Sequence, residues 1–182
     1  VLIDPSVSVT DVDSGNFDGG RLIVSVISGY NSQGADLSQN LPLQDHFGVR
    51  NQGSGAGQIG VSGSTVNYGG SAIGAIDSVH NGQNGVDLVI QFNASASAEA
   101  VEALIENLTY RNSSSDPVAS RLASVTVSDG DSATSAPRTV QINVTAEADG
   151  PSQLFTAGQV NTYATSTQSA PAMARSEERR VG

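Results

Sequence analysis

Several residue types are absent or rare in this chain of 182 residues, and each absence excludes a class of protein. There is no cysteine, which excludes disulfides, thiolate metal sites and a thiol nucleophile. There is no tryptophan and aromatic residues make up only 4%, so the core must consist mainly of Val, Ile, Leu and Ala. Unbroken aliphatic runs do not exceed three residues, and we therefore expect no membrane insertion.

Positive charge is also scarce. All eight basic residues are Arg, and they stand against 18 acidic residues, which gives a formal net charge of −10. A protein this acidic is repelled by phosphate backbones, so the composition argues against a nucleic-acid partner.

The two ends of the chain differ from its middle. Residues 1–5 are typical of the end of a strand, so we expect the first strand to be truncated. We predict one domain over residues 1–148, followed by a linker or the truncated start of a next repeat over residues 149–174. Residues 175–182 are similar to a translated sequencing adapter, and such a segment is excluded from fold reasoning.

Alternation of apolar and polar residues with a period of two is the dominant pattern of the sequence. It predicts eight to ten short strands in fewer than 150 residues, which favours an all-β fold, an antiparallel sandwich, over a parallel sheet. The apolar positions of these predicted strands are Val7 and Val9; Leu22, Val24 and Val26; Phe47 and Val49; Ile59 and Val61; Val66 and Tyr68; Ile73 and Ile76; Leu88, Ile90 and Phe92; Val125 and Val127; and Val140, Ile142 and Val144.

One segment, residues 97–108, departs from this alternation. Its apolar residues Val101, Leu104, Ile105 and Leu108 are spaced i, i+3, i+4, i+7, which predicts a short helix with one apolar face. Ser97 is a suitable N-cap residue. We expect the helix to pack against the core across an open end of the sandwich.

Catalytic motifs are not supported by their sequence context. Residues 55–60 (GAGQIG) match the dinucleotide fingerprint, but no helix follows them to hold a phosphate. His46 and His80 do not accompany a recognisable nucleophile, and there is no G-x-S-x-G elbow. We therefore expect a protein that is not an enzyme.

Acidic residues gather in loops and are candidate metal ligands. In an extended chain, residues i and i+2 project to the same side, so both carboxylates of a D-x-D motif can reach one cation. Ca²⁺ takes six to eight oxygen ligands in irregular geometry, which suits such loops. The alternative, which the spacing leaves open, is that Asp is simply a good turn residue. The candidate ligands are Asp11, Asp13, Asp18, Asp129, Asp131 and Asp149.

Three blocks of the sequence, taken together, resemble the cadherin-like repeats strung together in giant bacterial surface and secreted proteins. The resemblance implies an Ig-like β-sandwich with neighbouring repeats of the same chain as partners, Ca²⁺ near the domain ends, and an extracellular, secreted or cell-surface location. The boundary between repeats, usually an Asn-Asp pair, reads here as EADG at residues 147–150. The three blocks are residues 9–14 with 19–22, residues 50–55 through 68–70, and residues 103–110 with 127–131.

These observations give two hypotheses about function. The first is a calcium-stiffened structural or adhesion module, without enzymatic activity, in a large extracellular protein. The alternative is a carbohydrate-binding sandwich of an exported hydrolase, for which a glycan would be the partner. Glycan sites usually expose aromatic platforms, and this chain has only four Tyr and four Phe.

Overall fold

The computed structural model describes residues 1–11, 15–30, 43–114, 117–131 and 133–145. The chain divides into two units, Val1–Ala146 and Glu147–Gly182, and all described residues belong to the first. The predicted linker (149–174) and adapter-like end (175–182) therefore lie outside the described residues.

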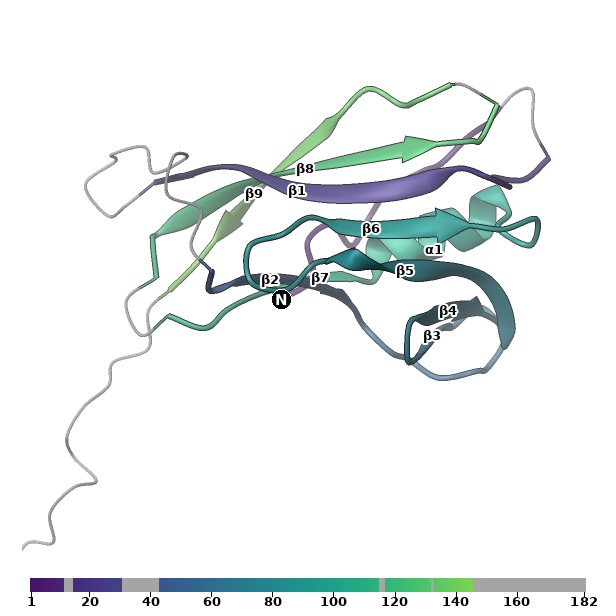
Figure 1. The fold of residues 1–182 in the computed structure, drawn as a ribbon, viewed down its shortest axis with the longest axis horizontal. Coiled ribbons are helices and arrows are strands. Elements are labelled where there is room, and N and C mark those ends of the chain that lie inside the picture. Colours follow the sequence, from purple (N-terminus) through teal and green to yellow (C-terminus); the bar gives the residue numbers. More distant parts are fainter. Residues whose placement is uncertain (12–14, 31–42, 115–116, 132, 146–182) are drawn as a thin grey trace, which may run out of the picture. The chain divides into compact units, whose positions relative to one another are not determined.

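Nine strands and one helix form the described part of the chain (Figure 1). Seven strands make one antiparallel sheet in the order β3-β4-β5-β6-β1-β8-β9, and β2 pairs with β7 in a second sheet. The prediction of an all-β antiparallel sandwich with one short helix is confirmed. The elements are β1 (Arg21–Tyr30), β2 (Asp45–Val49), β3 (Ile59–Ser62), β4 (Thr65–Tyr68), β5 (Ser71–Asn81), β6 (Leu88–Phe92), α1 (Ala98–Glu106), β7 (Leu108–Asn112), β8 (Ser120–Ser128) and β9 (Arg138–Asn143).

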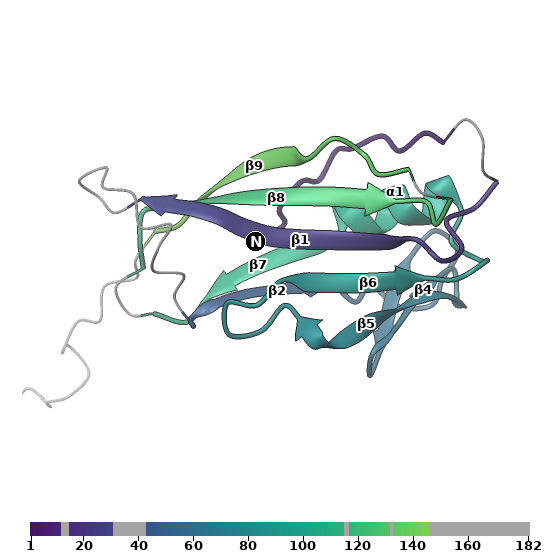
Figure 2. The ribbon, with the colours of Figure 1, turned by 45° about the horizontal axis from the view of Figure 1, so that its top comes forward.

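The core lies between the two sheets and α1, and strand alternation selects its side chains. In β1, Leu22 and Val24 are fully buried while Ile23 and Ser25 between and after them are only partly covered. Figure 2 shows β2 and β7 facing the larger sheet, with α1 at the end where β6 and β8 finish. The fully covered aliphatic side chains contributed by the other elements include Ile59, Val66, Leu88, Ile90, Val101, Leu104 and Leu108.

Helix α1 begins and ends for identifiable reasons. The Ser97 hydroxyl accepts a hydrogen bond from the N–H of Ala100 at 3.3 Å, so the predicted N-cap is confirmed. The helix ends at Glu106, two residues before the predicted end, because Leu108 begins β7 and pairs with Val49. The described residues contain no helix with the length and hydropathy that a membrane crossing requires.

The predicted strand around Val7 and Val9 does not form. Residues 4–10 make no backbone-to-backbone hydrogen bond within the described structure, although Val7 and Val9 are half-buried and Ser8 between them is exposed. Alternation indicates which side of a segment faces the core, whereas a strand also needs a neighbouring backbone to pair with. No such neighbour pairs with residues 4–10 among the residues that the structure describes.

The β3 edge of the large sheet is covered by the chain that precedes it. The side chain of Asn51 exchanges hydrogen bonds with Val61, donating to its carbonyl at 3.2 Å and accepting from its N–H at 3.3 Å. Gln52 does the same for Ile59, through its side-chain oxygen at 2.9 Å and its own N–H at 2.7 Å. Residues 55–60 lead directly into β3, which agrees with rejecting the dinucleotide fingerprint.

Candidate functional site

Two acidic loops pack against each other at the end of the sandwich where β1 begins and β8 ends. The two strands are antiparallel, and Arg21 pairs with Ser128. A Cβ on Gly130 would lie 2.0 Å from the carbonyl oxygen of Asp18, and a Cβ on Gly20 would lie 2.0 Å from that of Ser128. The loops therefore meet backbone to backbone, which only glycine permits. Gly130 also has φ of +93°, a conformation that favours glycine.

Asp129 has a clear local role in the second loop. Its Oδ1 accepts hydrogen bonds from the N–H groups of Asp131 at 2.8 Å and Ala133 at 3.3 Å, which closes the turn after β8. Asp129 is only 7% exposed, whereas Asp131 is exposed. The turn-forming interpretation of this DGD motif is thus supported for one oxygen of Asp129.

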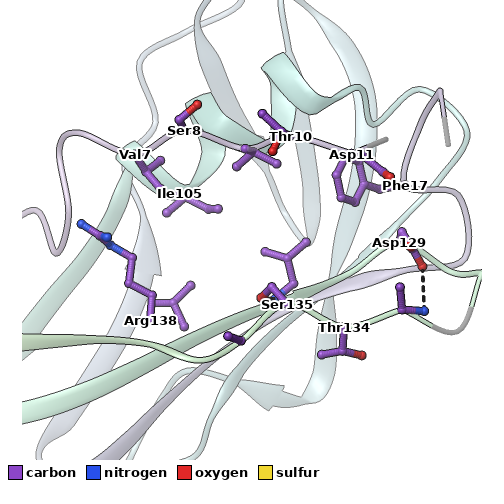
Figure 3. A pocket seen from close by; sticks show the side chains of 15 residues that line it. Val7, Ser8, Thr10, Asp11, Phe17, Ile105, Asp129, Thr134, Ser135 and Arg138 are labelled. Atoms are coloured by element: carbon purple, nitrogen blue, oxygen red, sulfur yellow. Dashed lines mark hydrogen bonds between the residues drawn. The ribbon is translucent and has the colours of Figure 1, made fainter. Parts of the chain in front are cut away.

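A cavity of about 400 Å³ adjoins these loops (Figure 3). Asp11 and Asp129 both line it, so the structure brings one carboxylate from each predicted acidic cluster to the same space. The N-terminal segment forms one side and the connection between β8 and β9 forms the other, as Figure 3 shows. Its lining consists of Val7, Ser8, Val9, Thr10, Asp11, Phe17, Ile105, Val125, Val127, Asp129, Ala133, Thr134, Ser135, Ala136 and Arg138.

The predicted calcium ligands are only partly brought together. Asp18 contributes its backbone at the loop contact and its side chain is exposed, while Asp13 and Asp149 lie outside the described residues. The described residues include no group of three or more Asp, Glu or His side chains placed to hold a metal ion. Carboxylates from this part of the chain therefore do not complete a calcium site on their own.

The described chain also ends away from the acidic loops. β9 finishes at Asn143, which pairs with Ser120 at the start of β8, whereas Asp129 follows the end of β8. With a rise of about 3.3 Å per residue, β8 separates these two ends by roughly 27 Å. The loop pair at Asp18 and Gly130 is thus on the opposite end of the sandwich from Asn143.

Sequence reasoning missed a buried ion pair between the two sheets. Asp45 of β2 and Arg121 of β8 have side chains only 1% exposed, and Nε of Arg121 lies 2.7 Å from Oδ2 of Asp45. The Tyr110 hydroxyl donates to Oδ1 of Asp45 at 2.5 Å, and the Asn112 amide donates to the same oxygen at 2.6 Å. Both oxygens of the buried carboxylate are therefore satisfied, as burial of a charge requires.

The environment of Asp45 changes the ionisation of its neighbour. Burial, and then the hydrogen bond to Asp45, raise the pKa of Tyr110 well above its usual value of 10.0. A sequence signal for the pair existed: Arg121 has the same strand phase as the buried residues Ala123 and Val125, which predicts an inward-pointing Arg.

The two histidines do not line the cavity. His46 Nδ1 lies 3.1 Å from Oε1 of Gln83 and its Nε2 lies 3.2 Å from Oγ of Ser113. His80 is an exposed neighbour of Asp77, with 3.4 Å between Nδ1 and the carboxylate. Both histidines therefore have local polar partners at positions away from the acidic loops.

Aromatic side chains in the described part of the chain mostly face inward. Phe17, Phe47, Phe92 and Tyr110 are buried, and the Tyr68 hydroxyl donates to Glu99 at 2.7 Å. These residues do not form an exposed platform of the kind that glycan-binding sites use.

Comparison with known proteins identifies no relative: no protein family model, no curated protein and no solved structure matches this chain.

Proposed function

We propose that residues 1–148 form a structural or adhesion module, without enzymatic activity, of a larger extracellular protein that is secreted or held at the cell surface. In this proposal, Ca²⁺ stiffens the end of the sandwich formed by the two acidic loops, and neighbouring repeats of the same chain are the partners. The observation that carries it is that these loops pack backbone to backbone while Asp11 and Asp129 line one cavity.

The physical argument concerns charge. Asp11, Asp129 and Asp131 come from two loops in contact, and Asp13 follows Asp11 by two residues in the sequence. Like charges at short separation raise the free energy of the folded state, and a divalent cation offsets that repulsion. Ca²⁺ accepts carboxylate and backbone carbonyl oxygens together, so it suits a site assembled from two loops.

A cation shared by both loops would also restrict motion. The first loop leads into β1 and the second connects β8 to β9, and β1 pairs with β8. Linking the loops therefore ties the entry of a central strand to the hairpin at the edge of the sheet. Extracellular modules of this kind use weak sites, with dissociation constants of about 10⁻⁴–10⁻³ M.

Thermal unfolding of the full chain, in 10 mM Ca²⁺ and in EGTA, tests the proposal. A site with a dissociation constant of about 1 mM should contribute about 1.4 kcal/mol, which raises Tm by about 3–6 °C. The Asp11→Asn/Asp129→Asn double variant should lose this increase. The matched control Asp87→Asn, which does not line the cavity, should keep it. An identical Tm in Ca²⁺ and EGTA for the unaltered chain would refute the calcium role.

A further inference from the structure

The N-terminal segment beside the cavity resembles a strand without a backbone partner in the described part of the chain. Residues 4–10 make no backbone-to-backbone hydrogen bond with other described residues. A side chain of α1 restrains the segment, since Val9 N–H donates to Oε2 of Glu102 at 3.0 Å. Successive N–H groups of an extended chain point to opposite sides, so the N–H of Ser8 points away from Glu102. An ion pair between Asp4 and Arg138 ties the start of the segment to β9.

The opposite side of the cavity is an edge of the large sheet on which the described residues place no further strand. Ser135 N–H donates to the Val127 carbonyl at 2.8 Å and Asp129 N–H donates to the Ala133 carbonyl at 3.4 Å. Thr134 pairs with Ser128 between these two bonds as an isolated antiparallel bridge. In such a non-hydrogen-bonded pair, the N–H and C=O of each residue point away from the partner strand. The backbone groups of Thr134 therefore point outward from β8.

The space between these two backbones suits an apolar chain. Figure 3 shows Val7, Ser8 and Thr10 along one side, with Thr134 and Ser135 on the other. Phe17, Ile105, Val125 and Val127 supply the apolar part of the lining. The volume of about 400 Å³ falls within the range of ligand-binding cavities, roughly 300–1,000 Å³.

The charge of the lining indicates the chemistry of the occupant. Asp11 and Asp129 contribute two carboxylates at one end. Arg138, the one cation among the described lining residues, is paired with Asp4 from outside the lining. The cavity is therefore negative, as is the chain as a whole at −10. A second copy would carry the same net charge and be repelled, whereas a basic partner would be attracted.

We propose that this cavity binds an extended peptide strand of a partner protein, with small or β-branched apolar side chains at alternate positions and a Lys or Arg side chain beside Asp11 and Asp129. The peptide backbone would pair with Ser8 and Thr134, and its alternate side chains would contact Phe17, Ile105 and Val127. The peptide would belong to a protein to which the proposed adhesion module attaches, and this biological setting rests on the function proposed above. The binding itself needs no Ca²⁺.

Fluorescence anisotropy with the full chain and a dye-labelled, end-blocked peptide tests the proposal. The probe is lysine-valine-threonine-valine-threonine-valine, and its control has glutamate in place of lysine. In EGTA we expect saturable binding of the lysine peptide and at least about tenfold weaker binding of the glutamate peptide. Equal binding of the two would overturn the charge argument, and no saturable binding would overturn the proposal.

A pair of substitutions at one position separates backbone pairing from side-chain contact. Ser8→Pro removes an N–H that makes no hydrogen bond to another described residue, so Tm should change little while affinity falls about tenfold. Ser8→Ala keeps the N–H and should bind as the unaltered chain does. If Ser8→Pro binds the lysine peptide normally, the strand-pairing geometry is wrong.

Repeating the titration in 10 mM Ca²⁺ distinguishes this inference from the calcium proposal. If Ca²⁺ binds at Asp11 and Asp129, it neutralises the carboxylates that attract lysine, and affinity should fall at least threefold. Unchanged affinity together with unchanged Tm would refute the calcium role and leave peptide binding intact. A concentration-dependent dimer in sedimentation, blocked by Ser8→Pro, would assign the cavity to a second copy and overturn the present assignment.

Discussion

The carboxylate buried between the two sheets and the carboxylates of the acidic loops have different surroundings. Asp45 points inward from a strand, where Arg121, Tyr110 and Asn112 satisfy both of its oxygens. Asp129 sits in a loop, where one oxygen closes a turn and its neighbour Asp131 is exposed. The buried carboxylate has a fixed set of side-chain partners from other strands, whereas Asp129 accepts hydrogen bonds from backbone N–H groups of its own loop.

Breaking the buried pair of Asp45 and Arg121 should have the largest effect. Arg121→Met leaves the Asp45 charge buried without its cation, and we expect a loss of about 3–5 kcal/mol in the free energy of unfolding, measured by urea denaturation. The double variant Arg121→Met/Asp45→Leu should recover part of that loss, because it removes both charges while Tyr110 and Asn112 still lose their acceptor. Arg111→Met, at an exposed position of β7, is the matched control and should be near neutral. A loss below about 1 kcal/mol for Arg121→Met would contradict the structural role of the pair.

Tyr110 should make the free energy of unfolding depend on pH in the alkaline range. Tyr110→Phe removes a hydrogen bond to a charged group, at a cost of about 1.5–3 kcal/mol near neutral pH. The folded-state pKa of Tyr110 is raised above the unfolded value of 10.0, so its stabilising contribution is intact below pH 10. That contribution is lost as the pH rises from 10 toward the folded-state pKa.

Urea midpoints at pH 8, 10 and 11 measure this effect. We expect the midpoint of the unaltered chain to fall above pH 10, and that of Tyr110→Phe to fall less steeply. Tyr68→Phe is the matched control, because the hydrogen bond to Glu99 also raises the pKa of Tyr68, but at an exposed site. Parallel midpoint curves for the unaltered chain and Tyr110→Phe would show that Tyr110 does not cause the alkaline loss.

The smallest effect is expected at the end of the sandwich. Asp129→Asn keeps a side-chain oxygen that can accept from Asp131 and Ala133, so in EGTA the free energy of unfolding should stay within about 0.5 kcal/mol. The same substitution at Asp45 leaves Arg121 buried without an anion and should cost several kcal/mol. Equal losses at the two positions, measured by urea denaturation, would remove the distinction between them.

Much of the architecture could be predicted from local patterns. Alternation identified β1 to β6, β8 and β9 by their apolar positions, and the 3.6-residue pattern identified α1 with its Ser97 cap. It also produced an error at Val7 and Val9, where the segment alternates but lacks a pairing partner. A local pattern reports burial, and pairing depends on which distant segments become neighbours.

The same limit applies to the candidate site. The sequence separated the acids into two clusters, but their contact follows from the pairing of β1 with β8, which no local pattern specifies. Asp45 and Arg121 are 76 positions apart and were overlooked, although the inward phase of Arg121 was readable beside Ala123 and Val125. The occupancy of the acidic loops by Ca²⁺ stays a prediction.

The two edges of the large sheet differ in a way that limits how far assembly can proceed. The side chains of Asn51 and Gln52 hydrogen-bond to the backbone of β3, whereas the backbone N–H and C=O of Thr134 point outward from β8. A strand of a partner could therefore add beside Thr134, but the β3 edge offers few free backbone groups for a further strand. Growth would stop after one addition, giving one-to-one complexes in place of fibres.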